Sequence, residues 1–276
     1  MANGVRDGLH RVSQEQNSQY KTTLTFLIYL LVTLLMITAT FLNPPFMKRQ
    51  IRTSNNEAVV VRQVNKHFNT LANTIGASQS SNANLLTSKQ TQPIADHIID
   101  YALGFPWIKV NNTKLARQIL HDINLYIDQG SSSDAQLVQE KLKEQGSNAL
   151  YEVVDAFSLN TMMIGGNIAF ILLLGNLTII VMVALSLKSL LSEMRMVMNG
   201  KRLLHNITAA GMWAGFWVIL IAGLLALFPV IFNITGLAVL GYVLEIASSI
   251  FLDFVIVGVI LYIVMAIPWE ISSPNN

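Results

Sequence analysis

The hydrophobic positions of this chain fall into long runs separated by polar segments. Residues 22–42 carry no charge, and comparable apolar runs cover 160–187, 207–232 and 249–268. A helix of about 20 residues crosses the ~30 Å hydrocarbon layer of a bilayer. The pattern therefore predicts four transmembrane helices. The first run ends in Asn43-Pro44-Pro45 rather than at a small-residue cleavage site, so we expect a retained anchor and not a signal peptide.

A polar segment, residues 43–159, lies between the first two runs and is long enough for one small domain. Its apolar residues recur at intervals of three or four, which places them along one side of a helix. Three such stripes are Val61, Val64, Phe68, Leu71 and Ile75; Leu115, Ile119, Ile123 and Ile127; and Val138, Leu142, Ala149, Val153 and Phe157. No part of the segment alternates with period two over a useful length. We therefore expect a small helical bundle.

Three sequence signals divide this bundle. Residues 76–93 are rich in Ser, Asn and Gln, which is typical of a linker. A short helix is predicted next, over 94–103, because Gly104-Phe105-Pro106 stops it. Gly146 interrupts the third stripe.

The distribution of Lys and Arg predicts the orientation. The loop between the second and third spans holds Lys188, Arg195, Lys201 and Arg202, whereas the connection 233–236 holds none. Basic residues favour the cytoplasmic side. The flanks of the first span are balanced and do not decide. We therefore expect both termini in the cytoplasm and residues 43–159 outside.

Together these patterns predict an all-α polytopic membrane protein with four transmembrane helices and a small helical extracytoplasmic domain between the first and the second. The predicted segments are a cytoplasmic tail (1–21), the first transmembrane helix (22–42), the external domain (43–159), the second transmembrane helix (160–187), a basic cytoplasmic loop (188–206), the third transmembrane helix (207–232), an outer connection or interfacial helix (233–248), the fourth transmembrane helix (249–268) and a cytoplasmic tail (269–276). This order of segments resembles the layout of the permeases of the cell-division ABC system.

Two carboxylates, Glu245 and Asp253, lie in the apolar run 237–269, which is longer than a bilayer requires. If the last span began near Leu237, both acids would be buried and could flank one side of a pathway. If it begins near Ser249, Glu245 lies at the outer interface and Asp253 about one turn inside.

The cost of burying charge favours the second placement. A carboxylate in the middle of the bilayer costs roughly 2.5–3.5 kcal/mol, and no Lys or Arg lies in any predicted span to offset it. Asp253 is then the main candidate for ion or proton coupling, with Glu245 as the second.

Small and amide residues predict where the transmembrane helices pack. Gly165, Gly166, Asn167 and Asn176 lie in the second run, and Gly211 and Gly215 have the G-x-x-x-G spacing in the third. Small residues let helix backbones approach closely, and asparagines form hydrogen bonds between helices. Asn167 and Asn176 are half a turn out of phase, so we expect them to meet different neighbours. The same small-residue faces are candidates for homo-oligomer contacts.

Other polar groups point weakly to sites. Asp96, His97, Asp100, His121 and Asp122 are the only grouping of His and carboxylates in the domain, but they lack a recognised metal-ligand spacing. We read them as solvated helix faces and predict no metal or cofactor. Candidates for docking of a partner are Trp107 in the domain and Arg195, Lys201 and Arg202 in the basic loop.

The amino-acid composition further narrows the class of protein. The chain is 52% hydrophobic and 12% charged, against about 25% charged in soluble domains. It has no cysteine, so disulfides and thiolate sites are impossible. A net charge of +2 does not suggest nucleic acid. We expect the inner membrane of a prokaryote, where the partners are lipid and other membrane or envelope proteins.

No catalytic motif is present, so we predict that the chain is not an enzyme. Our first hypothesis is a non-enzymatic membrane subunit of a multiprotein cell-envelope assembly serving secretion, transport or envelope machinery. A transporter or channel subunit that uses Asp253, with Glu245, is the first alternative. A transmembrane sensor or transmitter is the second.

Overall fold

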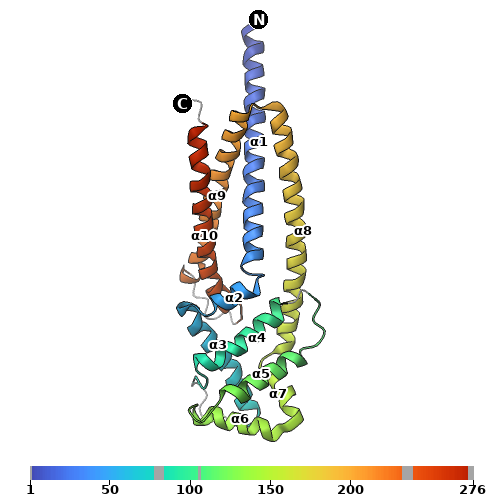
Figure 1. Ribbon diagram of the computed structural model, residues 1–276, viewed down its shortest axis with the longest axis vertical. Helices are drawn as coiled ribbons and strands as arrows, with labels where there is room; N and C mark the ends of the chain where they lie inside the picture. Colours follow the sequence, from blue (N-terminus) through green and yellow to red (C-terminus); the bar gives the residue numbers. More distant parts are fainter. Residues whose placement is uncertain (1, 78–83, 105–106, 232–238, 273–276) are drawn as a thin grey trace. The chain divides into compact units, whose positions relative to one another are not determined.

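The protein is helical throughout the part of the chain that the structure describes (Figure 1). The computed structural model describes the backbone of residues 2–77, 84–104, 107–231 and 239–272, with all side chains except those of 2–17, 55, 228–231 and 239–245. The helices are α1 (Ala2–Ala39), α2 (Pro44–Gln50), α3 (Ser54–Thr74), α4 (Ser88–Leu103), α5 (Thr113–Tyr126), α6 (Ser133–Gln145), the 3₁₀ turn η1 (Gly146–Asn148), α7 (Ala149–Ala156), α8 (Leu159–Val197), α9 (Gly200–Ile231) and α10 (Val239–Ile271). No strand occurs among these residues.

Four of the helices are long and apolar enough to cross a membrane. Within the described ranges these segments are Ser18–Ala39, Leu159–Val197, Gly200–Leu227 and Ile246–Ile271. Each exceeds the roughly 20 residues that a bilayer requires. The all-α, four-span membrane fold that the sequence predicts is therefore the fold of the chain.

The chain divides into two compact units. The membrane unit comprises Met1–Thr38 and Asn176–Asn276, and the bundle unit comprises Ala39–Gly175. The second boundary falls inside α8. Each unit is described by itself below.

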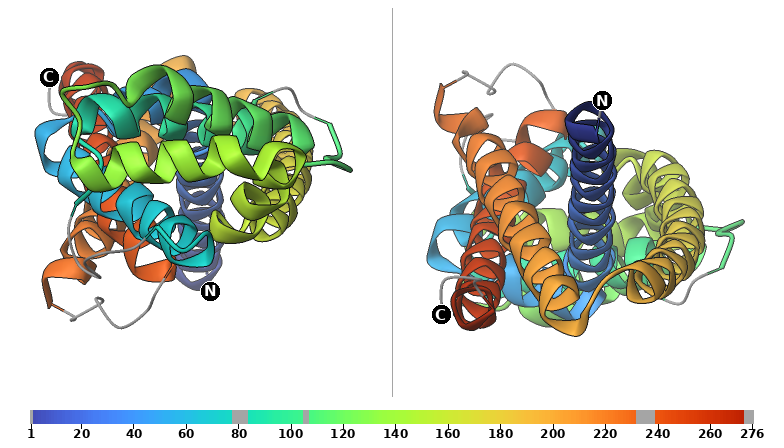
Figure 2. Two further views of the ribbon diagram at one scale, coloured as in Figure 1. Left: turned by 90° about the horizontal axis from the view of Figure 1, so that it is seen from below. Right: turned by 90° about the horizontal axis from the view of Figure 1, so that it is seen from above.

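The core of the bundle unit is built from the three apolar stripes. In the bundle, α4 packs against α3 and α5, and α7 packs against the same two helices (Figure 2, left). Every residue of the three predicted stripes is buried except Val61, which is half-buried. Phe68, Leu71, Leu115, Ile119 and Phe157 are completely inaccessible to solvent. The prediction of a helical bundle for this segment is confirmed.

The break in the third stripe has a backbone cause. Gly146 ends α6 with a φ of 53° and is followed by η1 and then α7. Glycine adopts a positive φ at little cost, so one helix can end and the next begin here. Val138 and Leu142 before the turn and Val153 after it then face the same core.

One helix of the bundle begins earlier than its sequence predicts. The helix expected over 94–103 is α4, and it starts at Ser88, inside the predicted linker 76–93. Thr87 and Gln90 form a capping box, with Gln90 Oε1 accepting from the Thr87 N–H at 2.8 Å. Pro93, the last residue of the predicted linker, is accommodated in the second turn, where the carbonyl group that loses its partner belongs to the exposed Lys89.

In the membrane unit, α9 and α10 form a close antiparallel pair (Figures 1 and 2). Ala210, Ala214, Val218 and Ala222 of α9 are buried, as are Ile250 and Phe254 of α10. A second cluster joins α1 to the turn between α8 and α9, through the buried Leu24, Met194 and Ala210.

Two predicted segment boundaries fall inside helices. The residues of the predicted basic loop, 188–206, are mostly helical, because α8 continues to Val197 and α9 begins at Gly200. Likewise α10 is unbroken from Val239, so the predicted interfacial helix (233–248) and the last span (249–268) share one helix from that residue on. The start of the predicted outer connection, 233–238, lies outside the described residues.

Candidate functional site

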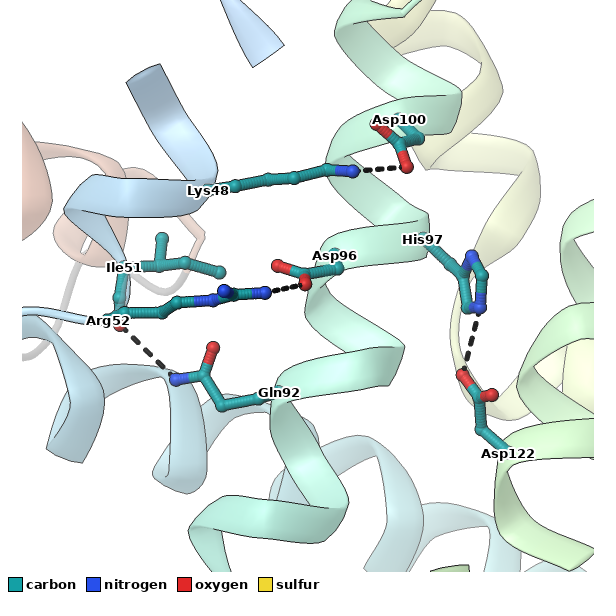
Figure 3. Close-up of polar contacts among 8 residues, drawn as sticks. All are labelled: Lys48, Ile51, Arg52, Gln92, Asp96, His97, Asp100 and Asp122. Carbon is teal, nitrogen blue, oxygen red and sulfur yellow. Dashed lines mark hydrogen bonds and ion pairs between the residues drawn. The ribbon is translucent and has the colours of Figure 1, made fainter. Parts of the chain in front are cut away.

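A cluster of charged side chains joins α2 to α4 (Figure 3). Lys48 of α2 forms an ion pair with Asp100, and Arg52, just after α2, forms one with Asp96. Asp96 and Asp100 are four residues apart, so one face of α4 presents both carboxylates. Each acid thus meets its own cation.

The two ion pairs border an open groove of about 510 Å³. Lys89 and His97 also line it, and Gln92 Nε2 at its edge donates to the Ile51 carbonyl oxygen at 3.4 Å. The side chains of Arg52 and Asp100 are at least half exposed, so each pair stabilises the fold by at most about 1 kcal/mol. In each pair one carboxylate oxygen, Oδ2, is engaged by the cation.

A third acid of the group lies on the other side of α4. His97 Nε2 is 3.3 Å from Asp122 Oδ2, and Asp122 of α5 is only 4% exposed. Burial raises the pKa of Asp122, and the nearby His97 and His121 oppose that rise. This pair links α4 to α5 in the interior of the bundle.

These contacts revise our reading of the His and carboxylate grouping. The prediction of a solvated helix face is correct for Asp100 and His121, which are exposed, but wrong for Asp122, which is buried. The cations of α2 were not anticipated as partners, because sequence separation hides them. Among the described residues, no group of three His, Cys, Asp or Glu side chains is placed to hold a metal ion.

The loop that follows α4 carries a prominent apolar surface. Trp107 is 67% exposed, Ile108 58% and Val110 85%. We call these three residues the apolar loop. Isolated exposed apolar side chains are ordinary, but three within four residues form a patch of the kind that marks interaction sites.

The apolar loop is held from behind by asparagines of α8. Asn167 Oδ1 accepts from the Lys109 N–H at 2.6 Å, and Asn167 Nδ2 donates to the Lys109 carbonyl oxygen at 3.0 Å. Asn112 Nδ2 donates to Asn160 Oδ1 at 2.7 Å. The Tyr101 hydroxyl donates to the Asn111 carbonyl oxygen at 3.1 Å. These hydrogen bonds hold the backbone of the loop in place, while its apolar side chains are exposed.

Glycine brings α8 close to this region. A Cβ on Gly166 would lie 3.3 Å from Ala102 Cα and 3.4 Å from Lys109 Cδ, whereas one on Gly165 would meet nothing within 4 Å. Burial lowers the pKa of Lys109. Of the two predicted packing glycines, Gly166 faces α4 and Gly165 faces open space.

Asn176 pairs with a different helix. Its Nδ2 donates to Thr38 Oγ1 at 2.6 Å and to the Leu34 carbonyl oxygen at 3.0 Å, so it joins α8 to α1 inside the membrane unit. Asn167 instead meets Lys109 in the bundle unit. The half-turn offset between the two asparagines agrees with their separate neighbours.

The spacing of Gly211 and Gly215 places both against α10. A Cβ on Gly215 would lie 2.9 Å from the Gly258 carbonyl oxygen, and one on Gly258 would lie 3.0 Å from the Gly215 carbonyl oxygen. A Cβ on Gly211 would lie 2.7 Å from Met265 Cγ. The two backbones touch at the Gly215–Gly258 crossing, which no larger residue permits.

The two predicted acids belong to the same helix. Asp253 lies on α10 beside the buried Phe254, is partly exposed, and forms no hydrogen bond or ion pair with the described residues. Glu245 is on α10 as well, but its side chain is among those not described.

The basic docking candidates are solvent-accessible. Arg195, near the end of α8, and Lys201 and Arg202, at the start of α9, are all exposed. Their neighbour Met194 is completely buried against Leu24 and Ala210, and Met196 is 80% exposed. This end of the membrane unit is therefore positively charged around an apolar cluster.

Two residues that make close contacts, Asn65 and Gly258, were not predicted from the sequence. Asn65 of α3 is 1% exposed and pairs with Leu86, accepting from its N–H at 2.7 Å and donating to its carbonyl oxygen at 2.9 Å. Its position beside the apolar stripe was the available signal. Gly258, alone within an apolar helix, was a signal for close approach.

Comparisons with protein-family models, curated proteins and solved structures gave no match to the chain.

Proposed function

We propose that this chain is a non-enzymatic, multi-pass membrane subunit of a multiprotein cell-envelope assembly, and that its bundle unit contacts a partner protein through the apolar loop. The setting we propose is a prokaryotic inner membrane, with both termini in the cytoplasm and the bundle outside. The basic end at Arg195, Lys201 and Arg202 then faces the cytoplasm.

The observation that carries the proposal is the combination of exposure and fixation in the apolar loop. Tryptophan is enriched among the residues that dominate binding energy, and such anchors are surrounded by contacts that exclude water. Ordering a side chain on binding costs about 0.5–1.5 kcal/mol, and a loop already held in place avoids part of that cost. The two bonds from Asn167 to Lys109 supply this preorganisation.

The test is site-specific crosslinking in the native membrane. A photoreactive amino acid replaces Val110, and the matched control carries it at Glu144, an exposed residue of α6 in the same unit. We expect one discrete protein adduct from position 110 and none from 144. Asn167→Ala should weaken the adduct severalfold because the loop loses its support.

Two results would contradict this proposal. Equal, diffuse labelling from both positions would mean that the loop has no specific partner. Adducts to lipid alone at position 110 would mean that the loop rests on the membrane instead.

Asp253 favours a second candidate function, a transporter or channel subunit. A carboxylate in a membrane-spanning helix is a candidate for an ion or proton pathway, because such groups are costly to bury and mark many of these pathways. Here Asp253→Asn should abolish coupled flux in proteoliposomes while the assembled complex persists. Unchanged flux would remove this candidate and leave the first untouched.

A further inference from the structure

Two apolar grooves of the membrane unit meet at one lysine. The first, about 520 Å³, lies between α1 and α9 and is lined by Lys21, Phe26, Trp213 and Trp217. The second, about 310 Å³, is lined by Lys21, Trp213, Phe216 and Tyr262 and reaches α10. Lys21 and Trp213 belong to both. These volumes are in the range of sites that bind small molecules.

The polar groups of the grooves gather at one end. Ser18, Lys21 and Thr22 form the first turn of the candidate span in α1, and Phe26 and Tyr29 follow one and two turns deeper. Thr22 Oγ1 donates to the Ser18 carbonyl oxygen at 3.0 Å, so this hydroxyl hydrogen is not available to a ligand. Lys21 forms no ion pair with any side chain described in the membrane unit. Lys21 is also the one Lys or Arg among the described residues that line the two grooves, so its ammonium group is the cation that a ligand in them would meet.

The remaining lining of each groove is largely aromatic. Trp213 is 51% exposed, and Phe26, Phe216 and Trp217 are exposed to a similar extent. Trp213 stands between the two grooves, with Phe216 in edge contact at 5.7 Å between ring centroids. A ligand with one anionic head and two apolar chains would place the head at Lys21 and one chain on either side of Trp213.

The surroundings favour an anionic head. Tyr20, next to Lys21, packs on the cluster of Leu24, Met194 and Ala210, which contains the turn between α8 and α9. Arg195 near the end of α8 and Lys201 and Arg202 at the start of α9 flank that turn. Basic groups at a membrane surface attract anionic lipids by about 1 kcal/mol each.

We propose that the two grooves together bind one anionic glycerophospholipid, with Lys21 on its phosphate and its two acyl chains along the aromatic walls. This site is independent of the proposed protein partner, because none of its residues lies in the bundle unit. It gives the membrane unit a specific lipid in place of a general lipid solvent.

The experiment uses the tryptophans of the chain itself. Three of its four tryptophans, Trp213, Trp217 and Trp269, line the grooves. The full chain is reconstituted in bilayers that contain brominated phosphatidylglycerol or brominated phosphatidylcholine at equal mole fraction. Bromine on the acyl chains quenches nearby tryptophans, so we expect stronger quenching by the anionic lipid.

Matched variants locate the cause. Lys21→Gln should lower the apparent affinity for the anionic lipid about fivefold, which corresponds to one lost cation. Lys21→Arg keeps the charge and should keep the preference. Lys201→Gln removes a cation from the same end but outside the grooves, so it should lower the preference less than Lys21→Gln does.

Three outcomes would overturn the proposal. The first is equal quenching of the unaltered chain by both lipids. The second is an undiminished preference in Lys21→Gln. The third is exclusion of both lipids because another protein helix fills the grooves, seen as a disulfide between two copies of a Phe26→Cys variant.

Discussion

At the scale of single residues, side-chain amides form the hydrogen bonds that loop backbone groups lack. Asn65 and Asn167 each bind both the N–H and the carbonyl oxygen of one loop residue, Leu86 and Lys109. Gln139 Nε2 donates to carbonyl oxygens at the end of α5, including that of Asn124 at 3.0 Å. Buried backbone groups must be paired, and a segment outside any helix finds no partner in its own backbone. These amides therefore decide where the loops of the bundle lie.

His67 gives the bundle a pH-dependent stability. Burial lowers its pKa below the usual 6.5, against the opposing effect of its hydrogen bond to the Ala156 carbonyl oxygen at 3.0 Å, while Lys66 lowers it further. The neutral ring therefore belongs to the folded state. Its contribution is complete above about pH 6.5, the ordinary histidine pKa, and is lost as the pH falls through the lowered folded-state value.

We therefore expect the thermal midpoint of the chain in detergent to fall between pH 7.5 and pH 5. In His67→Gln, which retains an amide donor but cannot titrate, that fall should be smaller. His121→Gln is the control, because His121 is exposed and outside the Ala156 contact. An identical pH dependence in all three proteins would show that His67 does not contribute.

At the scale of elements, the spacing of apolar residues predicted the helices of the bundle. It did not predict where α4 begins or which side chains form ion pairs. The stripe of α5 was predicted because its four apolar residues recur every fourth position, and all are buried. The start of α4 was missed because the Ser, Asn and Gln content of residues 76–93 indicated a linker, although Thr87 and Gln90 form a capping box there. The ion pairs of Lys48 and Arg52 could not be predicted, because nothing in the sequence shows that α2 lies beside α4.

The crossing of α9 and α10 should be sensitive to one methyl group. Gly215→Ala would bring a Cβ to within 2.9 Å of the Gly258 carbonyl oxygen, and backbone cannot move aside cheaply. We expect a loss of about 1–3 kcal/mol in stability from overpacking. Unfolding of the detergent-solubilised chain by a denaturing detergent measures this loss.

The matched control is Gly223→Ala on the same helix, where a Cβ would meet nothing within 4 Å. Alanine there gains helix propensity of up to about 1 kcal/mol, so this variant should be as stable as the original or more so. Equal destabilisation by both substitutions would refute the close crossing.

At the scale of the whole molecule, the fold follows from hydrophobic run length, while the sidedness rests on charge. The four long helices were predictable because the apolar runs are as long as a bilayer is thick. The partners of Asn167 and Asn176 were not, since half a turn of separation says that neighbours differ without saying which they are.

The absence of cysteine makes the sidedness directly testable. Single cysteines are introduced at Glu144 in α6 and Lys201 in α9, both exposed. In intact spheroplasts we expect a membrane-impermeant maleimide to label position 144 and to leave position 201 unlabelled until the membrane is opened. The reverse pattern would invert the orientation and place the bundle in the cytoplasm.

Two kinds of contact hold the elements of the bundle unit together, and they respond differently to the salt concentration. Lys48–Asp100 and Arg52–Asp96 are partly exposed ion pairs, and at physiological ionic strength the Debye length is about 8 Å. The amide contacts of Asn65 and Asn167 carry no net charge and are not screened. Raising the salt concentration should therefore speed hydrogen exchange in α2 while leaving the loops at Leu86 and Lys109 unchanged. The attachment of the short helix that follows the first span would then vary with the ionic strength of the medium.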